Sequence, residues 1–296
     1  MRQFLGLAVL AMMTAGVAAA QDAGGTPPPP PVPAPQAALV APEWRAVSAE
    51  NLLVIDTTKG RILVELTPEV APLHVERIKL LARRGFYDGV PWHRVIDWFM
   101  AQTGDPLGNG DGQSPYPDLK GEFTFRRETT LPFAAVAEPA GARVGFFHSL
   151  PIQTQPDSAF ALTADGKVHA WGLYCPGVAG MARDEGNDTA NSQFFLMRQA
   201  YPALDKRYSI WGMTVSGLDV VRNLKVGDGD NGMVGAEPDR MTRVRIAADI
   251  PEAERPSVQV LATDSPRFRA LVETTRAARG ADFSVCDVTL PVQVVN

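Results

Sequence analysis

Short apolar runs separated by turn residues dominate residues 50–250. The runs Leu52–Ile55 and Ile62–Leu66 flank the turn residues 58–60 and predict a β-hairpin. Residues 91–104 read as two apolar strands joined by a tight connection. Further strands are expected at 178–182, 193–197, 209–213 and 243–247.

Two helices accompany these strands. Pro72 can occupy the first turn of a helix that Gly85 ends, with Val75, Ile78 and Ala82 at helical spacing. A short amphipathic helix is expected over 218–224. About seven or eight short strands and two helices favour a mainly β fold, a closed antiparallel barrel with helices covering its ends.

Two regions lie outside this pattern. Residues 124–176 are predicted to be irregular, with scattered apolar runs such as Val144–Phe147. Residues 251–296 follow breaks at Pro251 and Pro256 and predict one helix, Pro266–Ala278, and one strand around Phe283–Val288. This C-terminal extension is too short to bury a core of its own, so we expect it to pack on the barrel.

The N-terminal residues predict export. Arg2, an apolar run over 4–13 and the small residues 18–20 are typical of a secretory signal peptide over residues 1–20, although an uncleaved anchor is the alternative. Residues 21–45 form a Pro/Ala-rich linker, including Pro27–Pro31, whose composition predicts a polyproline-like spacer. A ligand for a proline-reading partner is the other interpretation. Because of the signal peptide we expect a periplasmic protein with no membrane anchor after cleavage.

Charge and spacing exclude several function classes. The net charge is −5, from 28 basic and 33 acidic residues, without a long basic run, so we expect no nucleic-acid partner. The four histidines share no ligand spacing, and no metal site is expected. Asp228–Gly232 is a turn rather than a calcium loop, because its glycine falls one position early. No Gly-x-Ser-x-Gly elbow supports a serine nucleophile.

Cys175 and Cys286 are the only cysteines. An even count in an exported protein makes a disulfide plausible, and the bridge would tie the C-terminal extension to the barrel. Two buried free thiols are the alternative, and the sequence leaves both open.

The strongest functional signal is a conflict between pattern and charge in residues 91–104. This apolar hairpin carries one guanidinium, Arg94, and one amide, Gln102. A structural ion pair with Asp97 would be the plain explanation. If Asp97 and Trp98 form a two-residue turn, Arg94 pairs with Ala101, and Gln102 points to the opposite face. We therefore predict a β-bulge that brings both side chains to one site.

The motifs around this hairpin are similar to those of the cyclophilin-type peptidyl-prolyl isomerases. The resemblance covers roughly residues 52–123 and 177–250. Its motifs occur in the family's order: Gly85-Phe-Tyr-Asp-Gly89, His93-Arg94-Val-Ile96, Phe99-Met100, Gln102, Gly104-Asp105-Pro106, Ser192-Gln-Phe-Phe195, Leu204-Asp205, Tyr208 and Trp211-Gly212.

The resemblance implies an eight-stranded antiparallel barrel capped by two helices, and an activity that needs no cofactor. Arg94 looks like the catalytic arginine, and Gln102 and Gln193 like the amides that hold the substrate backbone. Ala182 and Arg183 occupy the strand that pairs with the peptide, and Gly110 lies in the glycine-rich loop beside the groove. The expected walls of the proline pocket are Phe99, Met100, Phe195 and Leu204, and Tyr208 is expected to be a further substrate-binding residue.

Several positions depart from the family pattern. Ala203 stands where eukaryotic members keep a Trp, so we expect weak cyclosporin binding, and Tyr208 replaces a His. An insertion of about fifty residues, near 126–175, precedes the strand at 178. The function implied is rotation of X-Pro bonds in Pro-containing client polypeptides, by a protein expected to be a monomer. A non-catalytic chaperone or scaffold that binds proline segments is the alternative.

Overall fold

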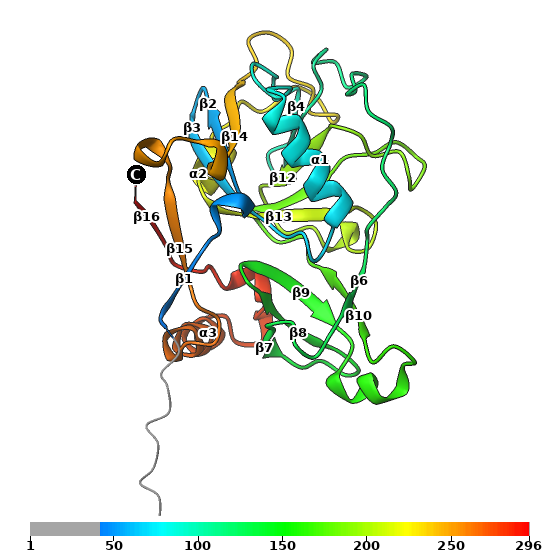
Figure 1. Cartoon of the computed structure of the whole chain (residues 1–296), viewed down its shortest axis with the longest axis vertical. Coiled ribbons are helices and arrows are strands. Elements are labelled where there is room, and N and C mark those ends of the chain that lie inside the picture. Colours follow the sequence, from blue (N-terminus) through cyan, green and yellow to red (C-terminus); the bar gives the residue numbers. More distant parts are fainter. Residues whose placement is uncertain (1–41, 296) are drawn as a thin grey trace, which may run out of the picture. The chain divides into compact units, whose positions relative to one another are not determined.

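The computed structural model describes residues 42–295 (Figure 1). The predicted signal peptide and most of the predicted linker lie outside the described residues. The end of that linker range already belongs to the fold, because strand β1 (Trp44–Ala46) begins within it. None of the helices in residues 42–295 is long and apolar enough to cross a bilayer.

Eight antiparallel strands form the main sheet, in the hydrogen-bonded order β14-β2-β3-β13-β11-β12-β5-β4. The predicted hairpin is present, and Gly60 pairs with Thr57 at its turn. The bounds of the eight strands are Leu52–Thr57 for β2, Gly60–Leu66 for β3, Arg94–Val95 for β4, Met100–Thr103 for β5, Val178–Met181 for β11, Phe194–Met197 for β12, Ile210–Ser216 for β13 and Met241–Ile246 for β14.

The main sheet is curled, but it is not the closed barrel that the sequence predicts. Its edge strands β14 and β4 form no ladder with each other. Two isolated bridges, Pro91 to Arg240 and Arg94 to Met233, link these edges instead. The reason is local. Strand β4 has only two residues, and no strand is present between residues 223 and 240, so β4 has no neighbouring strand on its outer side with which to form a continuous ladder.

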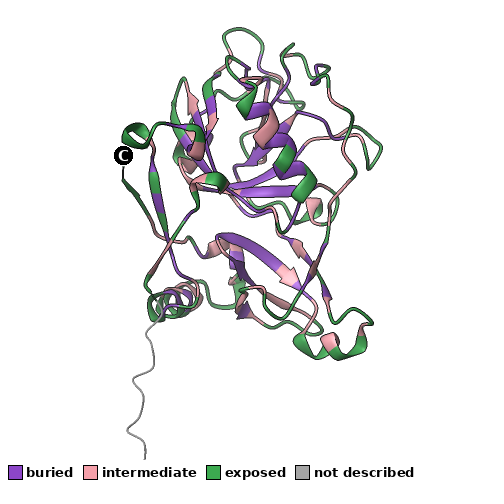
Figure 2. Cartoon of the chain, in the orientation of Figure 1, coloured by how far each residue is buried: buried purple, intermediate pink, exposed green. Residues whose placement is uncertain are grey.

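Both predicted helices contribute side chains to the core of the main sheet. Helix α1 (Pro72–Arg83) buries Val75, Ile78 and Ala82, as its apolar stripe predicts. Helix α2 (Leu218–Arg222) is shorter than expected and contributes Val221 to the same cluster. Figure 2 shows the buried residues of α1 and of the strands around it in purple.

The insertion is not irregular. It forms a second antiparallel sheet in the order β6-β10-β9-β8-β7, drawn mainly in green in Figure 1. Its short strands are interrupted by residues that read as breakers, such as Gly145 and Pro151. Gly145 is needed because an added Cβ would lie 2.0 Å from the Ala134 carbonyl oxygen across the sheet. The strands are Phe125–Arg127 for β6, Ala134–Ala137 for β7, Arg143–Phe147 for β8, Leu150–Thr154 for β9 and Val168–Gly172 for β10.

The strands of the C-terminal extension pack on the outer face of the main sheet, whereas its helix packs against the insertion. Strand β15 (Ser257–Leu261) lies between β1 and β16 (Val292–Val295), and its valines pack against Leu52, Val54 and Leu63 of β2 and β3. Helix α3 (Pro266–Arg279) matches the predicted helix. The strand predicted around 283–288 is wrong, because residues 285–287 form a 3-10 turn.

A disulfide joins Cys175, at the end of the insertion, to Cys286 of the C-terminal extension. The Cα atoms are 5.1 Å apart, and the cysteines are separated by 111 residues in sequence. The bridge therefore ties two segments that the sequence alone leaves independent.

Candidate active site

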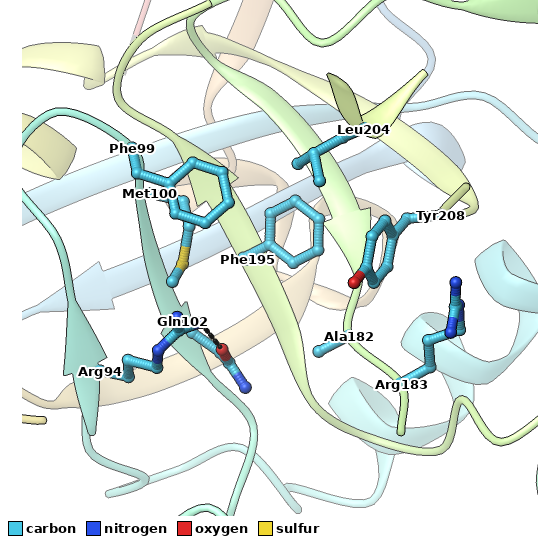
Figure 3. Close-up of a pocket in the computed structure, with 9 residues that line it drawn as sticks. All are labelled: Arg94, Phe99, Met100, Gln102, Ala182, Arg183, Phe195, Leu204 and Tyr208. Carbon is cyan, nitrogen blue, oxygen red and sulfur yellow. Dashed lines mark hydrogen bonds between the residues drawn. The ribbon is translucent and has the colours of Figure 1, made fainter. Parts of the chain in front are cut away.

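Nine of the eleven site residues predicted from the sequence line one pocket of about 180 Å³, which we call the main pocket (Figure 3). Arg94 comes from β4, Met100 and Gln102 from β5, and Phe195 from β12. Leu204 is carried by a 3-10 turn, Pro202–Leu204. The complete lining is Arg94, Phe99, Met100, Gln102, Ala182, Arg183, Phe195, Leu204 and Tyr208.

Arg94 and Gln102 reach this pocket without the predicted bulge, so that prediction is wrong. Arg94 pairs directly with Gln102, and Val95 pairs with Ala101. The Ile96 N–H donates to the Met100 carbonyl at 2.9 Å, which leaves residues 97–99 as a three-residue connection. The loop has three residues where two were expected, so the pairing of the two strands shifts by one residue. Arg94 then lies opposite Gln102 instead of Ala101, and both side chains project from the same face.

The Arg94 guanidinium is half-buried and is not paired with a carboxylate among residues 42–295. Asp97, the partner in the alternative of a structural ion pair, instead accepts a hydrogen bond from Arg198 Nη2 at 2.7 Å. Arg94 Nε donates to the Asn231 carbonyl at 2.8 Å. Burial lowers the pKa of Arg94, and nearby Tyr208 acts in the opposite direction. An arginine starts so far above neutrality that the side chain stays charged.

Asn231 was missed by sequence reasoning, although the 228–232 segment was correctly read as a turn. Gly232 in this turn packs against the hairpin, where an added Cβ would lie 2.3 Å from Ile96 Cγ1. Because of that close approach, the Asn231 carbonyl can orient Arg94. No sequence pattern connects positions 137 residues apart.

The two predicted glutamines form a relay. Arg94 Nη1 donates to Gln102 Oε1 at 3.1 Å, and Gln102 Nε2 donates to Gln193 Oε1 at 2.9 Å. Gln193 Nε2 in turn donates to the carbonyls of Gly110 at 2.7 Å and Gly112 at 3.0 Å. Since each amide both accepts and donates a hydrogen bond, the orientation of each is fixed, and Gln102 Oε1 faces Arg94.

Gly110 and Gln193 line a smaller hollow beside the main pocket, about 90 Å³ in volume. This side pocket shares Gln102, Ala182 and Arg183 with the main pocket. The two cavities therefore form one groove, which is apolar at one end and polar at the other.

Asp105 organises the glycine-rich loop and was noticed in the sequence only as part of a motif. Its carboxylate is fully buried and accepts hydrogen bonds from the N–H groups of Leu107, Asn109 and Gly110 at 2.7, 2.9 and 2.6 Å. An Asp followed by a glycine-rich turn is the available sequence signal, because Asp side chains bond to backbone N–H groups just ahead.

Ala182 and Arg183 lie just beyond the strand in which they were expected, because β11 ends at Met181. The Ala182 N–H donates to the Gln193 carbonyl at 2.9 Å. The Arg183 guanidinium lies 4.6 Å from the Tyr208 ring centroid and donates to the Arg207 carbonyl from Nε and Nη2. Arg183 thus forms a fixed wall between the two pockets.

The main pocket offers a charged donor in apolar surroundings. Met100 and Phe195 are 1% and 5% exposed, so these walls are held by the core beneath them. No group of three or more His, Cys, Asp or Glu residues in the described chain is arranged to hold a metal ion. The pocket combines apolar walls with hydrogen-bond donors from Arg94 and the amides.

Known proteins are similar to this chain. The family model for "Cyclophilin type peptidyl-prolyl cis-trans isomerase/CLD" matches residues 52–246. A probable peptidyl-prolyl cis-trans isomerase of Brucella suis is 34% identical over 216 residues, which cover 69% of this chain and 86% of that protein. Peptidyl-prolyl cis-trans isomerase B of Bacillus subtilis is 30% identical over 169 residues, covering 57% of this chain and 86% of its own length.

The similarity to a solved structure extends further along the chain. The crystal structure of cyclophilin AquaCyp293 from Hirschia baltica aligns with a TM-score of 0.77 and 34% sequence identity, covering 85% of this chain and 93% of that one. The chain therefore belongs to the cyclophilin-type peptidyl-prolyl cis-trans isomerases.

Proposed function

We propose that this peptidyl-prolyl cis-trans isomerase rotates X-Pro bonds in exported client polypeptides, with Arg94 stabilising the twisted bond. The observation that carries the proposal is a guanidinium that lines an apolar pocket and has no carboxylate partner in the described chain. Even partial burial of a cation without a counter-charge is costly, and a bound ligand that accepts its hydrogen bonds offsets this cost.

The chemistry requires a donor of this kind. Rotation about the amide breaks its resonance and faces a barrier of about 18–20 kcal/mol. At the twisted geometry the proline nitrogen recovers its lone pair and accepts a hydrogen bond. A preorganised guanidinium binds that nitrogen more strongly than the planar ground state, and such differential binding is what accelerates a reaction.

Arg94 is oriented for this role. Nε and Nη1 are occupied by the Asn231 carbonyl and Gln102 Oε1, whereas Nη2 forms no hydrogen bond to the described residues. The fixed fork of the guanidinium therefore presents one remaining edge to the main pocket. Neither a covalent intermediate nor an acid–base step is needed.

One hydrogen bond does not account for the whole effect. An acceleration of roughly 10⁵-fold corresponds to about 7 kcal/mol. We assign the remainder to positioning: the apolar walls hold the proline ring, and Gln102 holds the adjoining carbonyl through the second hydrogen of Nε2. The side pocket then accommodates the residue that precedes the proline.

The test is a refolding assay limited by proline isomerisation, run with wild type, Arg94→Ala and Arg243→Ala. Arg243 is exposed and lies on β14, so its variant controls for loss of one positive charge. We expect Arg94→Ala to lower kcat/KM by roughly 10²-fold or more, the scale of losing one transition-state donor. Equal rates for Arg94→Ala and wild type would leave only the binding role of a chaperone or scaffold.

We also propose that the protein acts after export, in the periplasm. The support is the composition of residues 1–20 and a disulfide of the kind that persists in oxidising compartments. N-terminal sequencing of the protein purified from a periplasmic extract should begin near Gln21. A chain that keeps Met1 and stays in the cytoplasmic fraction would contradict this proposal.

A further inference from the structure

We infer that Tyr174, the last residue of the insertion before Cys175, is a positioning residue of the main pocket. It lines neither the main pocket nor the side pocket, yet it contacts the residues that hold the apolar walls of the main pocket in place. The inference rests on the proposed function, since it concerns how the same pocket is shaped. It also assigns a role to a segment that lies outside the motifs shared with the family.

The Tyr174 ring lies directly behind Phe195. Tyr174 is 1% exposed, and its ring centroid lies 5.8 Å from that of Phe195 at an interplanar angle of 25°. On another side, Tyr208 meets Phe195 edge to face at 5.8 Å. Since Phe195 is held between these two rings, removing one of them leaves it free to change its side-chain conformation.

The backbone at Gly180 leaves space for this stack. A Cβ added to Gly180 would lie 2.6 Å from Phe195 Cζ and 2.7 Å from Tyr174 Oη. Strand β11 therefore passes against both rings at the one position without a side chain. This close fit leaves no room for the stack to shift toward β11.

The main chain of Tyr174 supports the opposite wall. Its N–H donates to Asp205 Oδ1 at 2.9 Å, and its carbonyl accepts from the Tyr201 N–H at 2.8 Å. These two bonds bracket the turn that carries Leu204, whose own N–H donates to the Tyr201 carbonyl at 3.1 Å. The Tyr201 ring also contacts Phe99, with centroids 4.6 Å apart. Tyr174 is thus connected to three walls of the pocket: Phe195, Leu204 and Phe99.

The ring, rather than the hydroxyl, carries this role. Tyr174 Oη is buried and has no hydrogen-bond partner among the described residues. Replacing Tyr174 by Phe therefore removes an unsatisfied group and keeps the stack. Replacing it by Leu removes the flat surface behind Phe195.

The experiment measures KM and kcat of the full-length, oxidised protein with an Ala-Ala-Pro-Phe peptide. The apolar walls contact the proline ring in the ground state and in the transition state alike, so a misplaced wall weakens both. We therefore expect Tyr174→Leu to raise KM about fivefold or more with kcat within about twofold, and Tyr174→Phe to keep the wild-type KM.

Tyr87→Leu is the matched control. Tyr87 is also fully buried, but it packs against Phe194, which points to the other face of β12. This variant should lower the melting temperature without raising KM, because partial unfolding reduces the amount of active enzyme and not its affinity. A KM change in Tyr174→Leu alone therefore separates positioning from general stability.

An unchanged KM in Tyr174→Leu would overturn the inference, as would an equal rise in KM in Tyr174→Phe. If Tyr174→Leu does not fold, Tyr174→Met takes its place, because a flexible side chain fills the space without a flat surface. An unchanged KM in that variant would have the same meaning. A wild-type protein without isomerase activity would instead contradict the proposed function.

Discussion

Arg94 and Gln102 lie directly opposite each other in the β4–β5 pair, and Arg94 Nη1 is 3.1 Å from Gln102 Oε1. The amide oxygen orients the guanidinium without neutralising it. This distinction matters because a carboxylate in the same place would satisfy the charge that the twisted proline bond is proposed to use. The identity of the residue at position 102 therefore sets how much of the Arg94 charge remains available.

The first prediction follows from this contact. Gln102→Glu should lower kcat by about tenfold or more, because an ion pair holds Arg94 in the ground state and reduces the differential stabilisation of the transition state. Gln259→Glu is the control, since Gln259 is exposed on β15 and lines neither pocket. The measurement is steady-state kinetics at pH 7. A Gln102→Glu variant as active as Gln259→Glu would show that the charge of Arg94 is not needed.

The second prediction concerns acid stability through Asp105. Burial alone raises the pKa of this carboxyl, but the N–H groups of the glycine-rich loop, led by Gly110, outweigh burial and hold the pKa below its ordinary value. The unfolded chain therefore binds this proton more readily than the folded chain. The stabilisation is complete above about pH 4 and is lost as the pH falls through the lowered folded pKa.

Asp105→Asn should therefore cost about 1–3 kcal/mol of unfolding free energy at pH 7 and make the profile flatter below pH 4. Urea unfolding at several pH values measures both effects. Asp111→Asn, an exposed carboxylate on the same loop, should leave the profile unchanged. Parallel profiles for wild type and Asp105→Asn would contradict the account of this loop.

The third prediction concerns the junction between the N-terminal strand, the main sheet and the insertion. Glu65 is 4% exposed and accepts hydrogen bonds from Arg45 Nη1 and Nη2 at 2.7 and 2.9 Å and from Ser149 Oγ at 2.5 Å. Arg45→Met leaves this buried carboxylate without its cation, so we expect a loss of about 3 kcal/mol in unfolding free energy.

The matched control is Arg267→Met, which breaks an ion pair with Glu43 in which both side chains are about half exposed. That change should cost at most about 1 kcal/mol, because water and salt screen an exposed pair. Chemical denaturation gives both values. Equal losses for the two variants would mean that the Glu65 junction behaves as an ordinary surface ion pair.

The fourth prediction concerns the bridge between Cys175 and Cys286. In the chain-entropy account, closing a loop of about a hundred residues stabilises the fold by about 4–5 kcal/mol. The variant with Cys175→Ser and Cys286→Ser should therefore unfold at a lower denaturant concentration, and dithiothreitol should lower the wild type to the same value. The variant itself should not respond to dithiothreitol. A wild type that resists denaturant equally well with both thiols reduced would contradict this prediction.

Local pattern was sufficient where an element is decided by its own residues. The apolar runs of β2 and β3 and the stripe of Val75, Ile78 and Ala82 predicted a hairpin and a helix that the structure contains. Pattern failed in the insertion, where short strands carry breakers such as Pro151 and are stabilised by pairing with neighbours. It also failed at the hairpin of Arg94, because one extra loop residue decides the register.

The sequence by itself determined which side chains could do the chemistry. A guanidinium and an amide in an apolar hairpin, with the motifs around them, were enough to select Arg94, Gln102 and the apolar walls. Only the tertiary structure decided what holds them: the Asn231 carbonyl, the loop organised by Asp105, and Tyr174 behind Phe195. The physical reason is that a side chain's chemistry is local, whereas its orientation depends on packing and hydrogen bonds between segments far apart in the chain.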